Sequence, residues 1–203
     1  MAKKVSGMRV PYGQAVYGKE EISAVNRVLK NPFKISPGEK SQEFEKKIAH
    51  LYGKKFGVMV NSGSSANLLA LESLNLPPKA EVITPIFTVG TTVAPILQKG
   101  LVPVFVDVEE GTYLANIDQI EKAISTKTRA IMVPQLLGNI MDMARLRSIA
   151  KKHTLFLIED SCDTLGATFA GKPTGFFSDI TTTSFYASHI ITAGATGGMA
   201  AFH

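Results

Sequence analysis

The chain has 203 residues, of which 45% are hydrophobic, and its mean hydropathy is +0.12. These values predict one globular domain with a sizeable core and exclude a disordered chain. The formal charge is +5, but the lysines are scattered as doublets at 46/47, 54/55 and 151/152. Because no basic stripe with interleaved aromatic residues results, we expect a solvated surface with a bias toward small anionic molecules, and no nucleic-acid partner.

Apolar stretches in this chain are short, and cysteine is rare. Runs such as 130–133 and 155–158 are far shorter than the roughly 20 residues that a membrane-spanning helix needs. The basic start at residues 1–4 lacks the apolar region of a secretory signal, and a single Cys162 excludes an internal disulfide framework. We therefore expect a cytoplasmic protein with no membrane contact.

Apolar residues at helical spacing predict two helices in the first quarter of the chain. The first covers Lys19–Lys30 and is ended by Asn31-Pro32. A loop is expected over residues 33–40. Ser41 then opens a second helix, which Gly53 stops.

Beyond this point predicted strands alternate with predicted helices. The strands are 56–60, 81–84, 102–106, 129–133 and 155–158, and the helices between them are 64–74, 89–98, 117–124 and 142–152. A β-branched run follows at 180–183, and residues 197–203 resemble the beginning of a further strand. The alternation predicts an α/β fold with a mostly parallel sheet covered by helices on both faces, in which ligands bind at the carboxyl ends of the strands.

Four places after strands carry groups suited to chemistry. Residues 61–67 open a helix whose free N–H groups would bind phosphate, although the same residues would make an ordinary N-cap. Glu159 and Asp160 end a strand, where a carboxylate could hold a protonated heteroaromatic nitrogen, bind a metal, act as a base or cap the next turn. Ser184 could reach a phosphate, and His189 could move protons near neutral pH; alone, each is more often structural.

Several motifs occur in a fixed order along nearly the whole chain. They are Ser62-Gly63-Ser64-Ser65, 81–85, 103–108, 158–160, 166–168 and Ser184-Phe185. Together they resemble the sugar aminotransferase family called DegT/DnrJ/EryC1/StrS. The resemblance implies the aspartate-aminotransferase-like fold of type I pyridoxal-phosphate enzymes, nucleotide-linked keto sugars as substrates, and a homodimer. It also implies an N-terminal arm and helix at 1–40 and an incomplete, truncated large domain at 41–203, with the C-terminal small domain absent.

By this resemblance the chain binds pyridoxamine or pyridoxal 5′-phosphate. The backbone at Gly63, Ser64 and Ser65 would hold the phosphate, helped by the Ser184 hydroxyl. Asp160 would pair with the pyridine nitrogen and keep the ring protonated, so that the ring withdraws electrons.

Two further positions near the ring depart from the family pattern. Val89 occupies by length the place of the aromatic side chain that normally stacks on the ring, and Phe87, two residues earlier, is the aromatic candidate for stacking. Asp163 stands where ordinary family members have glutamine or histidine near the ring oxygen. We therefore expect Phe87 and Asp163 beside the cofactor.

His189 replaces the lysine that aminotransferases of this family carry five residues after the serine of Ser184-Phe185. An imidazole has no primary amine to hold the cofactor as a Schiff base, but it can move protons. A branch of the family, the CDP-4-keto-6-deoxyglucose-3-dehydrases and their GDP-sugar relatives, uses histidine there, and residues 158–166 are similar to the CDP-sugar enzymes. The resemblance thus implies C3 dehydration of a nucleotide-linked 4-keto-6-deoxyhexose for deoxysugar or lipopolysaccharide O-antigen biosynthesis. In it His189 is the base.

Cys162 stands where the CDP-sugar enzymes have one of four ligands to a [2Fe–2S] cluster, which relays electrons from a flavin or iron–sulfur reductase partner. The other three ligands would lie beyond residue 203, and a small buried hydrophobe is an equal alternative for Cys162. Three other functions stay open: a GDP-4-keto-6-deoxymannose 3-dehydratase, an aminotransferase in which another lysine substitutes, and a truncated inactive paralogue or regulatory partner.

Overall fold

A computed structural model describes residues 13–31, 33, 38–194 and 196–203. The basic start and residues 34–37 of the predicted loop at 33–40 lie outside the described residues. The helices are α1 (Lys19–Leu29), α2 (Glu39–Leu51), α3 (Gly63–Ser73), α4 (Gly90–Gln98), α5 (Ile117–Lys122), α6 (Met143–Lys152) and the 3₁₀ helix η2 (Thr174–Phe176). The strands are β1 (Phe56–Val60), β2 (Glu81–Pro85), β3 (Val102–Val106), β4 (Thr128–Pro134), β5 (Phe156–Asp160), β6 (Thr168–Phe169), β7 (Lys172–Pro173), β8 (Ile180–Ser184) and β9 (Gly198–Phe202).

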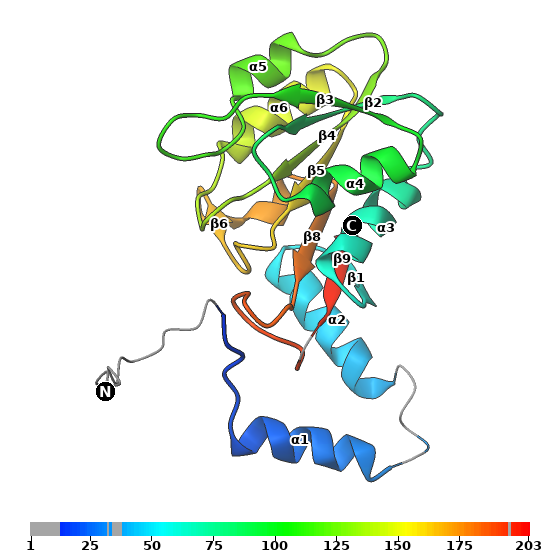
Figure 1. Cartoon of the computed structure of the whole chain (residues 1–203), viewed down its shortest axis with the longest axis vertical. Coiled ribbons are helices and arrows are strands. Elements are labelled where there is room, and N and C mark those ends of the chain that lie inside the picture. Colours follow the sequence, from blue (N-terminus) through cyan, green and yellow to red (C-terminus); the bar gives the residue numbers. More distant parts are fainter. Residues whose placement is uncertain (1–12, 32, 34–37, 195) are drawn as a thin grey trace, which may run out of the picture.

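Seven strands form one sheet in the order β1-β9-β8-β5-β4-β2-β3 (Figure 1). The strands from β8 to β3 pair in parallel, and β9 lies antiparallel between β1 and β8. The predicted mostly parallel α/β sheet is therefore confirmed. The run at 197–203 is an interior strand rather than an edge strand. Sequence reasoning missed the hairpin of β6 and β7, because strands of two residues have no detectable periodicity.

Alternating side chains along the central strands divide the core into two layers. Ile131 and Leu157 pack on one face with Leu146 of α6. Met132 and Ile158 pack on the other face with α3 and α4. All five side chains have little or no exposed surface, and burying such a side chain contributes about 2 kcal/mol. This alternation also decides which side chains at the strand ends reach the α3 and α4 side.

The first helix, α1, lies apart from the sheet and buries none of its residues (Figure 1). Its start is fixed by Glu21, whose carboxylate accepts the Gly18 N–H at 2.7 Å. The second helix, α2, begins at Glu39 instead of the predicted Ser41, because Gly38 takes the extended conformation of an N-cap. The predicted boundary at residue 40 thus falls within the first turn of α2.

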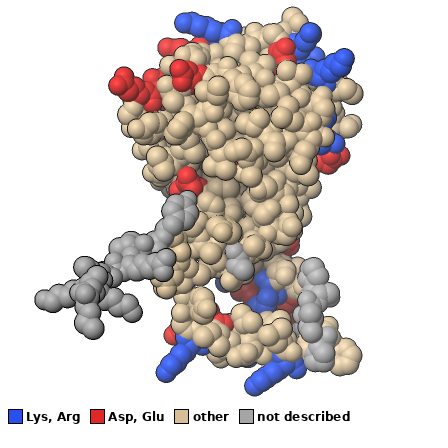
Figure 2. Space-filling model, viewed as in Figure 1, with Lys and Arg blue, Asp and Glu red and all other residues tan. Residues whose placement is uncertain are grey.

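Lysine and arginine side chains on the face shown in Figure 2 lie toward its edges and ends, and the middle of that face is largely uncharged. Among the described residues, no helix combines the length and the apolar character needed to cross a membrane.

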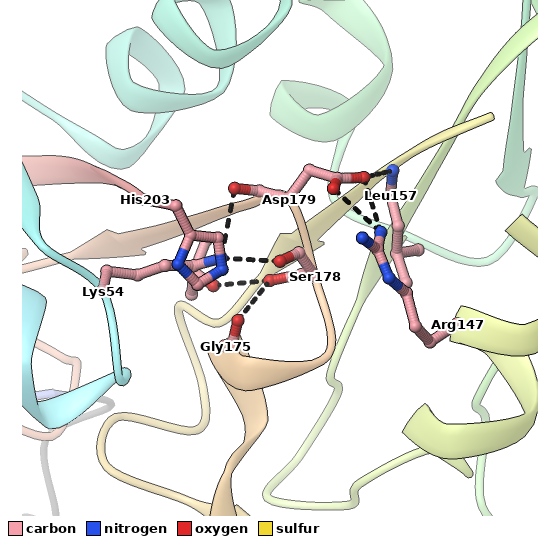
Figure 3. A network of polar contacts seen from close by, with 8 residues as sticks. Lys54, Arg147, Leu157, Gly175, Ser178, Asp179 and His203 are labelled. Carbon is pink, nitrogen blue, oxygen red and sulfur yellow. Dashed lines mark hydrogen bonds and ion pairs between the residues drawn. The ribbon is translucent and has the colours of Figure 1, made fainter. Parts of the chain in front are cut away.

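Lys54 is a buried lysine at the amino end of β8, where it joins three parts of the chain (Figure 3). Its ammonium group donates to the carbonyl oxygens of Ser178 at 2.6 Å and Asp179 at 3.1 Å, and lies 3.0 Å from His203 Nε2. The Asp179 carboxylate is held in turn by Arg147, with 2.8 Å to each oxygen. These contacts fix the turn between α2 and β1, the turn before β8 and the end of β9 to one another.

Lys54 makes stability depend on pH in a defined direction. Burial lowers the pKa of Lys54 from its ordinary value of 10.5 to about 8, although the carboxylates of Glu159 and Asp179 oppose this shift. Between these pH values the unfolded chain holds the Lys54 proton and the folded chain releases it, so the folded state gains stability as pH rises. Relative to Lys54→Met, we expect the free energy of unfolding of the native chain to rise by about 2 kcal/mol between pH 8 and pH 10, measured by chemical denaturation.

Lys55→Met is the matched control, because Lys55 is the next residue and is exposed. It should follow the native chain across this range. Titrating groups that do not interact with Lys54 are common to all three proteins and cancel in the comparison. The same pH dependence in the native chain and Lys54→Met would contradict the assignment.

Candidate active site

A cavity of about 210 Å³ opens at the carboxyl ends of β4, β5 and β8, beside the first turns of α3 and α4. This is the edge of the sheet where the alternating pattern predicts ligands. The predicted site residues in its wall are Gly63, Ser64, Asp160, Cys162, Asp163, Ser184 and His189. Ser65 and Phe87 are not part of the wall. Among the described residues, no lysine or arginine lines it.

The first turn of α3 presents backbone N–H groups to the cavity. Ser62 caps the helix, and its Oγ accepts the N–H of Ser65 at 3.2 Å. The helix itself offers no acceptor to the N–H groups of Gly63 and Ser64, which remain available for a ligand. The N–H of Ser65 is used by the cap, so the structure does not give Ser65 the predicted phosphate contact.

Ser184, at the end of β8, faces the same turn of α3. A Cβ atom added to Gly63 would lie only 2.8 Å from Ser184 Cβ and 3.1 Å from Cys162 Sγ. The Ser184 Oγ accepts the N–H of Tyr186 at 3.3 Å. A hydroxyl can donate as well as accept, so Ser184 can add a donor beside the N–H groups of α3.

Asp160 is a buried and hydrogen-bonded acid in the cavity wall, with only 5% of its surface exposed. Its Oδ2 accepts from Asn67 Nδ2 at 2.8 Å and from Thr92 Oγ1 at 3.0 Å. Its Oδ1 accepts a longer bond, 3.3 Å, from the Cys162 N–H, and the Cys162 thiol also hydrogen-bonds to the carboxylate. All of these donors are neutral groups. A buried carboxylate of this kind suits a protonated ring nitrogen as its cationic partner.

Sequence reasoning did not identify Asn67 and Thr92 as partners of Asp160, or Thr182 as the partner of Asn67. The Thr182 hydroxyl donates to Asn67 Oδ1 at 2.6 Å. Asn67 lies within the 61–67 motif, one turn after Gly63 on α3, so helical spacing could have placed it on the same face. Nothing in the sequence singles out Thr92 or Thr182.

Glu159, the neighbouring carboxylate, points to the opposite face of the sheet. It is fully buried, its Oε2 accepts from Thr181 Oγ1 at 3.1 Å, and its Oε1 has no partner among the described residues. Burial raises the pKa of Glu159. Of the two adjacent carboxylates, only Asp160 serves the cavity.

His189 and Asp163 face each other in the cavity wall. The Nδ1 atom of His189 lies 3.5 Å from Asp163 Oδ1, and Asp163 Oδ2 accepts the backbone N–H of Leu137 at 3.2 Å. A proton on Nδ1 would point to this carboxylate and leave Nε2 as the basic nitrogen. Asp163 therefore contacts the predicted base, in addition to lining the cavity.

The predicted stacking role of Phe87 does not agree with its position. Phe87 is 52% exposed and packs on Tyr113, with 5.4 Å between the ring centroids. Val89, the residue that matches the stacking position by length, lines the cavity together with Thr88. The turn before α4 thus brings Val89, which is itself 63% exposed, to the cavity and leaves the ring of Phe87 outside its wall.

Cys162 lies beside the first turn of α3, and burial raises the pKa of its thiol well above the ordinary value. The described part of the chain gathers no group of three histidine, cysteine or acidic side chains that could hold a metal. The [2Fe–2S] role of Cys162 stays a prediction.

The model of the DegT/DnrJ/EryC1/StrS aminotransferase family matches residues 16–203. The chain belongs to this family. It is 45% identical over 195 residues to a dTDP-4-dehydro-2,6-dideoxy-D-glucose 3-dehydratase of Saccharopolyspora spinosa, covering 92% of this chain and 42% of the relative. It is 37% identical over 180 residues to a UDP-N-acetyl-3-dehydro-alpha-D-glucosamine 3-aminotransferase of Acidithiobacillus ferrooxidans, covering 89% of this chain and 48% of the relative.

A solved structure of Escherichia coli GDP-4-keto-6-deoxy-D-mannose-3-dehydratase with bound hydrated PLP superposes with a TM-score of 0.88 at 32% identity. The match covers 96% of this chain and 51% of that one. The fold is therefore that of PLP-dependent sugar enzymes, and the chain spans about half the length of the curated relatives it matches.

The first turn of α3 packs so closely on β9 that the contact excludes a side chain. A Cβ atom on Gly198 would lie 2.2 Å from the Ser62 carbonyl oxygen and 2.6 Å from the Gly63 nitrogen. We expect Gly198→Ala to lower the free energy of unfolding by about 2 kcal/mol in urea denaturation, because overpacking displaces the backbone. Gly90→Ala is the control, since a Cβ there would meet nothing within 4 Å. Equal stability of the two variants would contradict this close contact.

Proposed function

We propose that these residues build the cofactor-binding part of a pyridoxamine-phosphate-dependent enzyme that removes the C3 hydroxyl of a nucleotide-linked 4-keto-6-deoxyhexose. The observation that supports this most directly is His189 in the cavity wall that also contains Asp160. A cofactor held as a Schiff base needs a lysine amine, and among the described residues none lines the cavity. A site that has a histidine base and no such lysine suits pyridoxamine phosphate, because this cofactor carries its own amine.

The donors of the cavity fit a phosphorylated pyridine. The N–H groups of Gly63 and Ser64, at the positive end of α3, would hold the phosphate together with the Ser184 hydroxyl. Asp160 would hold the ring nitrogen through Oδ1. When bound, pyridoxamine phosphate supplies an amine that condenses with the sugar ketone and a ring that withdraws electrons.

His189 would take up and return a proton at Nε2. An imidazole suits this task because its ordinary pKa lies near neutral pH. Asp163 would hold the other side of the ring through Nδ1, and its own position is fixed by the Leu137 N–H. The pair thus keeps one basic nitrogen directed into the cavity.

An aminotransferase with a substitute lysine is the alternative, and one of the relatives carries that activity in its name. Lys54 is a buried lysine with a lowered pKa, which is typical of a reactive amine. It contacts Ser178 and Asp179 before β8, whereas the cavity lies at Ser184, roughly 15 Å further along the strand. Lys54 therefore cannot take the place of the family lysine.

The homodimer, the [2Fe–2S] cluster and the reductase partner remain inferences from the family. The names of the relatives contain different nucleotides, so the proposed substrate is the class of nucleotide-linked 4-keto-6-deoxyhexoses. Reading the DNA beyond codon 203 tests the cluster directly, since a continuing frame with further cysteines would supply the ligands that Cys162 needs.

His189→Asn tests the proposal. With pyridoxamine phosphate and a CDP-, GDP- or dTDP-linked 4-keto-6-deoxyhexose, we expect the unmodified protein to release the C3 hydroxyl as water. The variant should be slower by at least about 100-fold, because general base catalysis is lost, and should keep the absorbance of the bound cofactor. Product formation is followed by mass spectrometry.

His153→Asn is the matched control, because His153 is exposed at the end of α6. It should behave as the unmodified protein does. No dehydration of any of the three sugars by the unmodified protein would contradict the proposed reaction. A cofactor–lysine adduct trapped by borohydride would favour the aminotransferase instead.

A further inference from the structure

The two oxygens of the Asp160 carboxylate have different surroundings. Oδ2 accepts two hydrogen bonds, from Asn67 on α3 and Thr92 on α4. Among the described residues, Oδ1 accepts the longer contact from the Cys162 N–H, and the Cys162 thiol also hydrogen-bonds to the carboxylate. Because the two donors to Oδ2 come from different helices, they define the plane of the carboxylate. Oδ1 is thereby left as the oxygen that can meet a ligand.

Asn67 itself is fixed in one orientation. The Thr182 hydroxyl donates to Asn67 Oδ1 at 2.6 Å, and Asn67 Nδ2 also lies 3.4 Å from the Thr91 carbonyl oxygen. A flipped amide would place its oxygen against Asp160 Oδ2, so two acceptors would face each other. Asn67 is 1% exposed and Thr182 fully buried, so a lost partner could not be replaced by bulk water.

A neutral amide is also the suitable donor for this place. A lysine or arginine beside Asp160 would neutralise the carboxylate and compete with a cationic ligand. The amide orients the carboxylate and leaves its charge for the protonated ring nitrogen.

We propose that Asn67, held by Thr182, is a positioning residue that directs Oδ1 of Asp160 toward the ring nitrogen of the cofactor. The ligand in this inference rests on the proposed function. The orientation of Asp160 by Asn67 does not, because it concerns contacts within the chain.

Thr182→Val and Asn67→Ala test the proposal with pyridoxamine phosphate labelled with ¹⁵N in the ring. In the unmodified chain the ¹⁵N shift should show a protonated ring nitrogen. In both variants we expect the ring to lose its proton at a pH at least about one unit lower, and the dissociation constant of the cofactor to rise about tenfold. Thr182→Ser keeps the hydroxyl and should restore both values.

Thr183→Val is the matched control in the same strand. Thr183 is also buried, but its hydroxyl donates to the Ser161 carbonyl oxygen and not to the side chain of Asn67 or Asp160. It should leave ring protonation unchanged, and thermal melts of all variants show whether they fold. Native ring protonation and affinity in Thr182→Val and Asn67→Ala would overturn the inference while leaving the proposed function intact.

A crystal structure of the cofactor-free Asn67→Ser variant is a second and independent test. A serine hydroxyl lies closer to the backbone than the Asn67 amide and would not reach Asp160 Oδ2, to which the amide donates at 2.8 Å. The Asp160 carboxylate should therefore turn from its native plane. An unchanged carboxylate would overturn the inference. Failure of the unmodified chain to bind pyridoxamine phosphate would count against the proposed function, and this structure would still decide the role of Asn67.

Discussion

The buried carboxylate of Asp160 is the group around which the cavity is arranged. Removing a carboxylate from water costs several kcal/mol unless donors or a cation compensate, and here the compensating donors are neutral. They come from α3, α4 and the turn after β5, so the carboxylate ties both helices to the sheet. Oδ2 accepts two hydrogen bonds and Oδ1 a longer one from the Cys162 N–H, so Oδ1 has more capacity left for a cationic partner.

Helix α3 contributes to the site at two places, the free N–H groups of its first turn and the side chain that contacts Asp160. Its first turn provides the N–H groups of Gly63 and Ser64, and Asn67, one turn later, orients Asp160. Four residues of helix separate Gly63 from Asn67 by about 6 Å along the axis. The position of α3 is set in turn by its contact with Gly198 of β9 and Ser184 of β8, so the interior strand β9 matters for the site as well as for the sheet.

Alternation along β5 separates two kinds of buried acid. Asp160 faces α3 and α4 and stays reachable from the cavity, whereas Glu159 is enclosed on the other face, where burial raises its pKa. Lys54 lies at the far end of β8 and holds the turn before it. Glu159 is thus on the face of the sheet opposite to Asp160, although the two residues are adjacent in sequence. Lys54 contacts the end of β8 opposite to the cavity.

The sequence alone determined the strands at 56–60 and 102–106, the α/β class, the family and the exchange of lysine for His189, because periodicity and motifs are local properties. Tertiary structure alone decided that Val89 rather than Phe87 lines the cavity, that the Ser65 N–H is used by the helix cap, and that β9 lies inside the sheet. It also decided the partners of Asp160. Asn67 and Thr92 lie 93 and 68 residues away along the chain, and such contacts depend on how helices pack on strands, which no local pattern encodes.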